Sequence, residues 1–203
     1  GDKHAMRKTF TILCFCFVLS QSDCVEGRYV DDIFDVSVQY GIEYGQNVNE
    51  EFIFGNEYTQ TLYMDVYEPV GDTLEDRPII FFMYGGSFIG GTRDSEYMVA
   101  LCNSYASKGY VAVAIDYRLT PNLILDSTSQ KAYEAVIKAI HDLKAAIRYF
   151  RMDDQQSNIF RIDSDRVFVG GVSAGAIASL NSVYISSESE VLSLVTQEFI
   201  DNV

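Results

Sequence analysis

The sequence predicts an α/β fold with a mostly parallel central sheet, antiparallel strands at its N-terminal end and helices that cover it. Two observations lead to this prediction. Early segments alternate apolar and polar side chains with a period of two, as half-buried antiparallel strands do. Later segments are continuously apolar and are separated by helical patterns, as in parallel sheets buried on both faces. Ligands of such folds usually bind beyond the carboxyl ends of the strands.

Four strands are predicted in the first part of the chain, and the first two of them open the sheet. Residues 36–44 and 61–67 carry the alternating pattern and are expected to form half-buried antiparallel strands. Residues 78–84 and 110–116, which read PIIFFMY and YVAVAID, are apolar almost throughout. They are therefore expected to form parallel strands that are covered on both faces.

Three helices and one further strand complete the pattern. Residues 95–108 have a helical composition and end before Gly109, which suits a helix C-terminus, so they predict a βαβ unit. Residues 129–151 repeat apolar side chains at helical spacing and predict a long covering helix. Residues 166–170 predict a short buried strand, and residues 174–184 predict the helix that follows it.

Composition excludes several classes of protein. The chain has 203 residues, of which 48% are hydrophobic and 22% charged, which fits one globular domain and excludes a disordered or collagen-like chain. Its net charge of −14 opposes binding to nucleic-acid phosphates and to anionic membranes. We therefore expect no nucleic-acid partner. The negative charge does not exclude neutral lipids or esters as substrates.

The N-terminus is typical of a secretory signal. Met6 is followed by two basic residues, by the apolar run 9–19 and then by small and polar residues. The run is shorter than the roughly 20 apolar residues that span a bilayer, so no stable membrane anchor is expected. We predict upstream residues at 1–5, a signal peptide at 6–23 and a domain at 24–203 in a secreted or periplasmic protein. A buried first strand or helix is the alternative.

Removal of such a signal would change the cysteine count. Cys14 and Cys16 lie in the apolar run and would leave with it, so Cys24 and Cys102 would remain. An oxidising compartment would permit these two to form a disulfide. Lipid modification of Cys24 is the rival interpretation, although the residues before it do not resemble a lipoprotein signal.

The motif Gly-Val-Ser-Ala-Gly at residues 171–175 indicates nucleophilic chemistry. It follows an apolar strand directly and precedes an alanine-rich helix. A serine at such a sharp turn is exposed at a helix N-terminus, and glycines two residues away let strand and helix pass closely. Ser173 is therefore the candidate nucleophile, and the amide of Ala174 is a candidate oxyanion donor. The alternative is a glycine-rich turn in which Ser173 only caps the helix.

A second glycine-rich segment, residues 84–91, follows the strand at 78–84. Hydrolases of this layout supply their other oxyanion donors at this position. Gly85 and Gly86 are therefore the candidate donors. A phosphate-binding loop is disfavoured, because the segment lacks both the G-x-G-x-x-G register and a P-loop lysine.

Together these motifs resemble the α/β-hydrolase superfamily, and within it the secreted carboxylesterase and feruloyl- or acetyl-esterase-like branch. The resemblance covers about residues 35–185 and rests on four segments: YMDVYEP at 63–69, GGSF at 85–88, AIDYRL at 114–119 and GVSAG at 171–175. It implies Ser173 as nucleophile, with Gly85, Gly86 and Ala174 in the oxyanion hole. It implies neither a metal nor an organic cofactor. Asp116 and Tyr117 match a structural element, for which we favour support of the fold over catalysis.

Two features depart from the family pattern. The family usually has histidine where this chain has Tyr84, before the two glycines, which changes the side chain that orders the loop. The triad order of the family also requires an acid and then a histidine after the serine. No histidine follows Ser173, and His141 lies in a predicted covering helix, where a surface or packing role is expected. We therefore expect an N-terminal portion whose triad acid and histidine lie downstream of residue 203.

The first functional hypothesis is an exported serine hydrolase that cleaves small-molecule or polysaccharide-linked carboxylic esters. The second is a catalytically silent α/β-hydrolase-like binding or adhesion module, in which GVSAG is only a turn. A peptidase or a polymer depolymerase on the same fold is a third candidate, because fold does not fix substrate. The sequence does not predict an oligomeric state.

Overall fold

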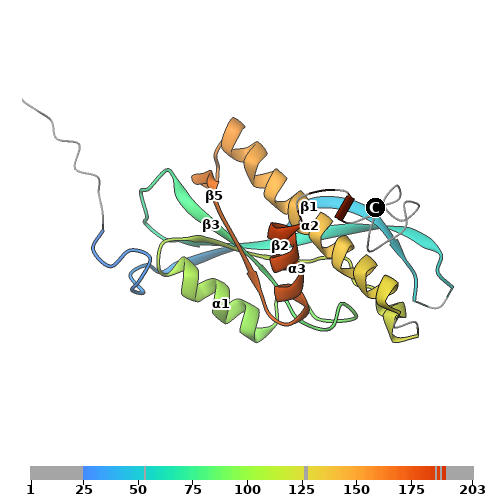
Figure 1. Ribbon diagram of the computed structural model, residues 1–203. Coiled ribbons are helices and arrows are strands. Elements are labelled where there is room, and N and C mark those ends of the chain that lie inside the picture. The colour runs from blue at the N-terminus through green and yellow to red at the C-terminus, as the bar shows by residue number, and fades with distance from the viewer. Residues whose placement is uncertain (1–24, 53, 126–127, 186, 188, 191–203) are drawn as a thin grey trace, which may run out of the picture.

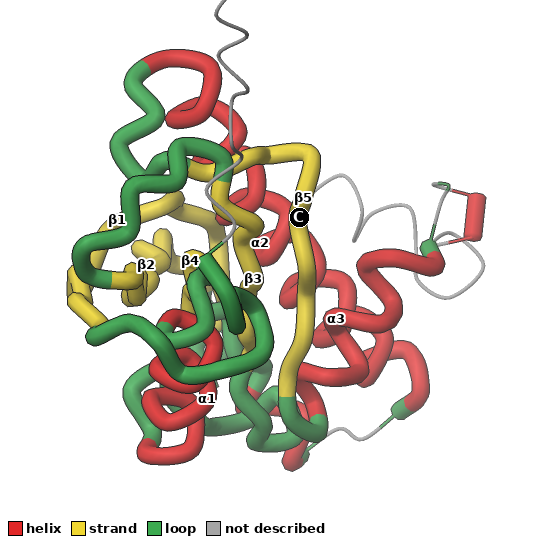
Figure 2. Tube along the Cα trace, turned by 90° about the vertical axis from the view of Figure 1, so that its left-hand side faces the viewer, coloured by secondary structure: helices red, strands yellow, loops and turns green. Residues whose placement is uncertain are grey.

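The computed structural model describes residues 25–52, 54–125, 128–185, 187 and 189–190, and a mixed sheet lies at its centre (Figure 1). The strands are β1 (Val36–Glu50), β2 (Glu57–Pro69), β3 (Arg77–Met83), β4 (Val111–Ile115) and β5 (Ile162–Gly171). The helices are α1 (Glu96–Ala106), α2 (Ser129–Gln156) and α3 (Ala174–Tyr184), with a short 3₁₀ helix η1 (Pro121–Ile124) after β4. Figures 1 and 2 show α1 on one face of the sheet and α2 with α3 on the other.

The strand order is β1-β2-β4-β3-β5, and its pairing confirms the predicted mixture of directions. β1 pairs with β2, and β2 with β4, in antiparallel fashion. β3 lies parallel to both β4 and β5, so their carboxyl ends meet at one edge of the sheet. The predicted βαβ unit is β3-α1-β4. The loops that leave β3, β4 and β5 at this edge carry the Gly-rich segment, Asp116 and Ser173, as the sequence predicts.

Three strands differ from their predictions, and α2 ends at Gln156, beyond the predicted residue 151. β1 and β2 form a long hairpin of 15 and 13 residues, because their polar outer ends continue to pair as far as Glu50 and Glu57. The prediction of a short buried strand at residues 166–170 was wrong in length and burial. β5 begins at Ile162, and Phe168 is 49% exposed, because among the described residues only β3 pairs with it.

The core lies between the sheet and its helices. Every residue of β3 and β4 is buried, which confirms that these strands are covered on both faces. Phe81 of β3 meets Phe150 of α2 edge-on, with ring centroids 5.5 Å apart. Burial of one such aromatic side chain contributes about 2 to 3 kcal/mol to folding.

α2 also carries a buried ion pair. The side chains of Arg118 and Asp142 are 0% and 1% exposed. Arg118 donates from Nε to Asp142 Oδ1 at 3.0 Å and from its backbone amide to Oδ2 at 2.8 Å. Its Nη1 also donates to the carbonyl of Val48 at 2.8 Å. The pair therefore joins the segment after β4 to α2 and to the far part of β1.

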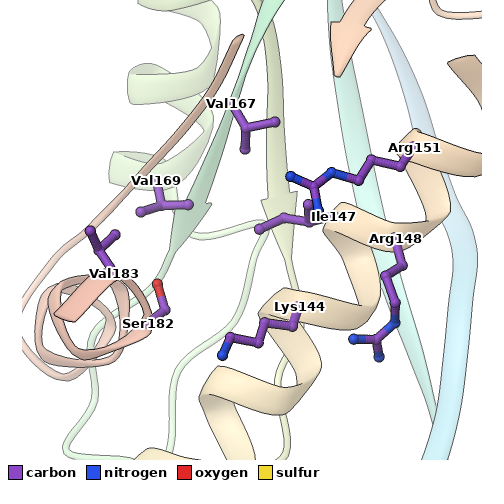
Figure 3. Close-up of a pocket in the computed structure, with 8 residues that line it drawn as sticks. All are labelled: Lys144, Ile147, Arg148, Arg151, Val167, Val169, Ser182 and Val183. Carbon is purple, nitrogen blue, oxygen red and sulfur yellow. The ribbon is translucent and has the colours of Figure 1, made fainter. Parts of the chain in front are cut away.

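A cavity of about 390 Å³ lies between α2, β5 and α3 (Figure 3). Val167 and Val169 of β5 and Val183 of α3 line it with apolar surface. The basic side chains at its α2 wall are Lys144, Arg148 and Arg151. Within the part of the chain that the structure describes, this side of β5 is an open edge of the sheet.

Several predictions concern residues outside the described part of the chain. The predicted upstream residues, the signal peptide and Cys24 all lie within residues 1–24. Cys102 lies buried in α1, has no disulfide partner among the described residues, and burial raises the pKa of its thiol to about 12. Its pairing with Cys24 stays a prediction. Among the described residues, no helix is long and apolar enough to cross a membrane, and no cluster of three His, Cys, Asp or Glu side chains could hold a metal ion.

Candidate active site

Ser173 lies in a strained turn between β5 and α3. It is the N-cap of α3 with φ 51° and ψ −114°, which non-glycine residues rarely adopt. Val172 donates its amide to the Met83 carbonyl at 3.1 Å, and Gly175 donates to Val172 at 3.0 Å, so the turn is fixed from both sides. Ser173 is exposed. Among the described residues its hydroxyl has no hydrogen-bond partner, so it is available to a reagent or a substrate.

Two glycines allow the strand and the helix to meet at this turn. A Cβ placed on Gly171 would lie 2.5 Å from the Gly175 carbonyl carbon. A Cβ on Gly175 would lie 2.2 Å from the Met83 oxygen and 2.6 Å from the Tyr84 oxygen. These are backbone atoms, which cannot move aside as a flexible side chain can. The GVSAG spacing therefore has a steric cause here, as the sequence interpretation requires.

Gly175→Ala is expected to lower the free energy of unfolding by about 3 kcal/mol, because its methyl group would overlap two carbonyls. Alanine normally stabilises a helix relative to glycine by about 1 kcal/mol, so the sign of the effect separates packing from helix propensity. Urea unfolding of the whole protein measures the change. Gly45→Ala is the matched control, because a Cβ there has no neighbour within 4 Å. Equal stability of the two variants would contradict the prediction.

The Gly-rich loop packs directly against the serine turn. A Cβ on Gly85 would lie 2.9 Å from the Val172 oxygen and 3.2 Å from Ser173 Cβ, so the structure brings these predicted site residues together. The amide of Gly85 already has an acceptor, because it donates to the hydroxyl of Tyr97 in α1 at 3.0 Å. Sequence reasoning missed Tyr97. No motif marks it, since the contact spans 12 residues between a loop and a helix.

The next residues of the loop adopt unusual backbone angles. Gly86, Ser87 and Phe88 have φ values of 135°, 55° and 63°. Gly86 and Ser87 are exposed, and within the described chain their amides have no hydrogen-bond partner. Ala174, at the first position of α3, also has an amide without a partner among these residues. The site therefore presents several unpaired N–H groups beside a strained serine. Ser87 was not among the predicted donors, because its residue type gives no signal of a backbone role.

Tyr84 occupies the position at which the family usually has histidine. Its ring stacks on Tyr117 with centroids 4.4 Å apart, and both side chains are buried. The Tyr117 hydroxyl donates to the Tyr84 carbonyl at 2.8 Å, and the Tyr84 hydroxyl donates to the Tyr117 carbonyl at 3.4 Å. Burial raises the pKa of both phenols, so both stay neutral. The stacked pair thus holds the start of the loop without a histidine.

Asp116 takes part in an ion-pair network. Arg93 donates from Nε to Asp65 at 3.0 Å and from Nη1 to Asp116 at 2.5 Å. Burial raises the pKa of Asp116, and the nearby Arg93 opposes that rise. The network ties the end of the Gly-rich loop to β2 and to the end of β4. These contacts support the interpretation of Asp116 and Tyr117 as fold-supporting residues.

His141 lies in the middle of α2, next to the buried Asp142. Ser173 lies at the N-terminus of another helix, α3. His141 is partly buried on a covering helix, as expected for a packing or surface residue. His4 lies outside the described residues. His141 therefore has the position on a covering helix that the sequence predicts.

The chain is similar to lipases and esterases. It is 28% identical over 129 residues to Lipase 1 of Geotrichum candidum, a match that covers 58% of this chain and 21% of the lipase. The propionate-bound structure of a thermophilic esterase from Thermogutta terrifontis is 25% identical, with a TM-score of 0.46 over 66% of this chain and 44% of the esterase. The native form is 22% identical, with a TM-score of 0.47 over 75% and 50%. The chain thus spans at most half the length of these relatives.

A family model gives the assignment. The model of the BD-FAE family matches residues 64–199, more than half of the chain. This range contains β3, β4, β5 and all three helices, with both glycine-rich turns. The mixed sheet, the helices on both faces and the serine turn after β5 are those of an α/β-hydrolase fold. By this match and this architecture, the chain belongs to the BD-FAE family.

Proposed function

We propose that this chain carries the nucleophile of a serine hydrolase that cleaves carboxylic esters. The observation that carries the proposal is Ser173, held at a positive φ on a helix N-terminus and packed against Gly85. Backbone strain of about 1 to 3 kcal/mol persists only where the surrounding structure imposes it, and it clusters at functional sites. A turn whose serine only caps a helix needs no such strain. α3 moreover has no cap hydrogen bond from the Ser173 side chain.

The proposed reaction begins with attack of Ser173 Oγ on the ester carbonyl carbon. The hydroxyl proton passes to a base, and the carbonyl oxygen takes up negative charge. Amides of Gly86 and Ala174 stabilise that oxyanion, aided by the positive end of the α3 dipole. The carbon–oxygen bond to the alcohol then breaks as the base protonates the leaving oxygen. The base then takes a proton from water, and the water oxygen attacks the acyl carbon. The bond from that carbon to Ser173 Oγ breaks, the base returns the proton to Oγ, and the carboxylic acid leaves.

The proposal includes a general base and an acid partner, which the whole protein would supply. A serine hydroxyl is a weak nucleophile until a neighbouring base removes its proton. We place a histidine and an Asp or Glu downstream of residue 203, in the triad order of this fold. The greater length of the matched lipase and esterase supports this placement.

The test is covalent labelling of the whole protein with a fluorophosphonate, followed by peptide mass spectrometry. Stoichiometric addition to the peptide that contains Ser173, together with hydrolysis of p-nitrophenyl esters, is the expected result. A serine esterase of known activity serves as the positive control for the reagent. A whole protein that folds cooperatively but neither labels nor hydrolyses esters would favour the silent binding module instead.

We further propose that the protein is exported and acts on a small-molecule or polysaccharide-linked ester without a metal or organic cofactor. The layout of residues 6–23 supports export. N-terminal sequencing of the mature protein tests it, and a mature chain that starts at Met6 would contradict it. Activity retained in the presence of a metal chelator is the expected result for a metal-free reaction.

A further inference from the structure

We propose that Tyr97 is a positioning residue that sets the Gly-rich loop against Ser173, an inference that rests on the proposed ester hydrolysis. Tyr97 lies in the first turn of α1, and its hydroxyl accepts the amide hydrogen of Gly85 at 3.0 Å. The side chain is 44% exposed, so its burial does not explain its position. The contact joins the beginning of the loop to a helix that follows the loop in the chain.

Gly85 is the point at which the loop meets the nucleophile. The space for a Cβ at Gly85 is closed by Val172 and Ser173, so the two backbones touch there. A shift of Gly85 would therefore change the distance between Ser173 and the amides that follow Gly85. Displacements of about 1 Å in such a site can cost about 100-fold in rate.

The loop needs an external tether because its own conformation is unfavourable. Ser87 and Phe88 are consecutive non-glycine residues at positive φ, a region that costs about 1 to 2 kcal/mol for each L-residue. The far end is held by Phe88, which is buried and whose carbonyl accepts the Thr120 amide at 2.6 Å. At the near end, the Gly85 amide is held by Tyr97.

Tyr84 does not perform this task. Its hydroxyl donates to the Tyr117 carbonyl, whereas the Gly85 amide donates to the Tyr97 hydroxyl. The Gly85 amide also cannot serve Tyr97 and an oxyanion in full at the same time, since it has a single hydrogen. The geometry thus assigns Gly85 to anchoring and leaves the unpaired amides of Gly86, Ser87 and Ala174 as the donors that the anchored loop presents.

The test compares Tyr97→Phe with the wild type in the whole protein. The variant keeps the ring and removes the acceptor. We expect kcat for p-nitrophenyl esters to fall by about tenfold or more, with KM changed less than about twofold, because a misplaced loop weakens transition-state binding more than substrate binding. Hydrogen exchange of the Gly85 amide, followed by NMR, should become at least about tenfold faster, since the amide loses its acceptor.

Tyr133→Phe is the matched control. Tyr133 lies on α2 and is similarly exposed, at 41%. Its substitution should leave kcat and the exchange rate of the Gly85 amide unchanged. Unchanged Gly85 exchange in Tyr97→Phe would overturn the contact, and faster exchange with unchanged kcat would overturn the positioning role. A rise in KM together with a lower melting temperature, but with unchanged kcat, would indicate a merely structural role for Tyr97. That result would also overturn the positioning role. A wild-type protein that neither hydrolyses esters nor labels would overturn the proposed function and this role together, whereas a loss confined to the variant leaves the function intact.

Discussion

Ser173→Ala is expected to lower kcat for ester hydrolysis by about 10⁴-fold or more in the whole protein, because it removes the atom that forms the acyl intermediate in the proposed mechanism. Fluorophosphonate labelling should disappear with it. Ser182→Ala is the matched control, since Ser182 lies on the same helix and, among the described residues, its hydroxyl donates to the Ser179 carbonyl at 2.7 Å. Residual hydrolysis above a few per cent of the wild-type rate would show that another group is the nucleophile.

A second substitution at this position separates chemistry from folding. Ser173→Gly should also abolish hydrolysis, yet it should raise the free energy of unfolding by about 1 kcal/mol, because glycine accepts a positive φ without strain. Ser173→Ala keeps the Cβ and the strain, and should have nearly wild-type stability. If both variants unfolded at a lower urea concentration than the wild type, the loss of activity could not be assigned to the missing hydroxyl.

Asp142→Ala is expected to lower the free energy of unfolding by about 3 to 5 kcal/mol. The substitution leaves the guanidinium of Arg118 buried without its counter-ion, and an uncompensated buried charge is strongly destabilising. Urea unfolding of the whole protein, monitored by tyrosine fluorescence and circular dichroism, measures the loss. A decrease below about 1 kcal/mol would mean that water reaches the pair.

Two further variants test the cause of that loss. Glu75→Ala removes an exposed partner of Arg161, whose nearest contact is 3.9 Å away, and should have little effect. The double variant Arg118→Met with Asp142→Leu removes both charges and should recover part of the lost stability, because apolar residues can replace a buried pair at small cost. Recovery stays partial, since the Val48 carbonyl loses its donor.

The sequence predicted those features whose causes are local. β3 and β4 were found from continuous apolar character, because a strand buried on both faces has no polar side to display. The serine turn was found from the spacing of Gly171, Ser173 and Gly175, because the motif itself needs a glycine on each side of the serine. The contacts with Met83 and Tyr84, at the end of the neighbouring strand β3, could not be predicted from that spacing. The helix at 174–184 has the predicted bounds.

Features that depend on distant partners were not predictable in the same way. The burial of β5 depends on what covers it and pairs with its outer edge, and the five residues RVFVG at 166–170 do not carry that information. Tyr97 meets Gly85 only because the loop and α1 fold back on each other. The partner of Arg118 is 24 residues away on another element, and many acidic residues could have taken that place in a chain with 29 of them.

Apart from the hydrogen bond between Gly85 and the Tyr97 hydroxyl, the serine turn and the Gly-rich loop meet through backbone atoms. Gly171 and Gly175 meet each other and the carbonyls of Met83 and Tyr84, while Gly85 meets Val172. Side chains that border these contacts, such as Val172 and Ile177, are exposed and take no part in the alignment. Substitutions at these two positions can therefore change the surface beside the serine turn without disturbing its backbone contacts. The backbone contacts fix the turn, while the exposed side chains beside it are free to vary. This arrangement makes the turn tolerant of sequence change.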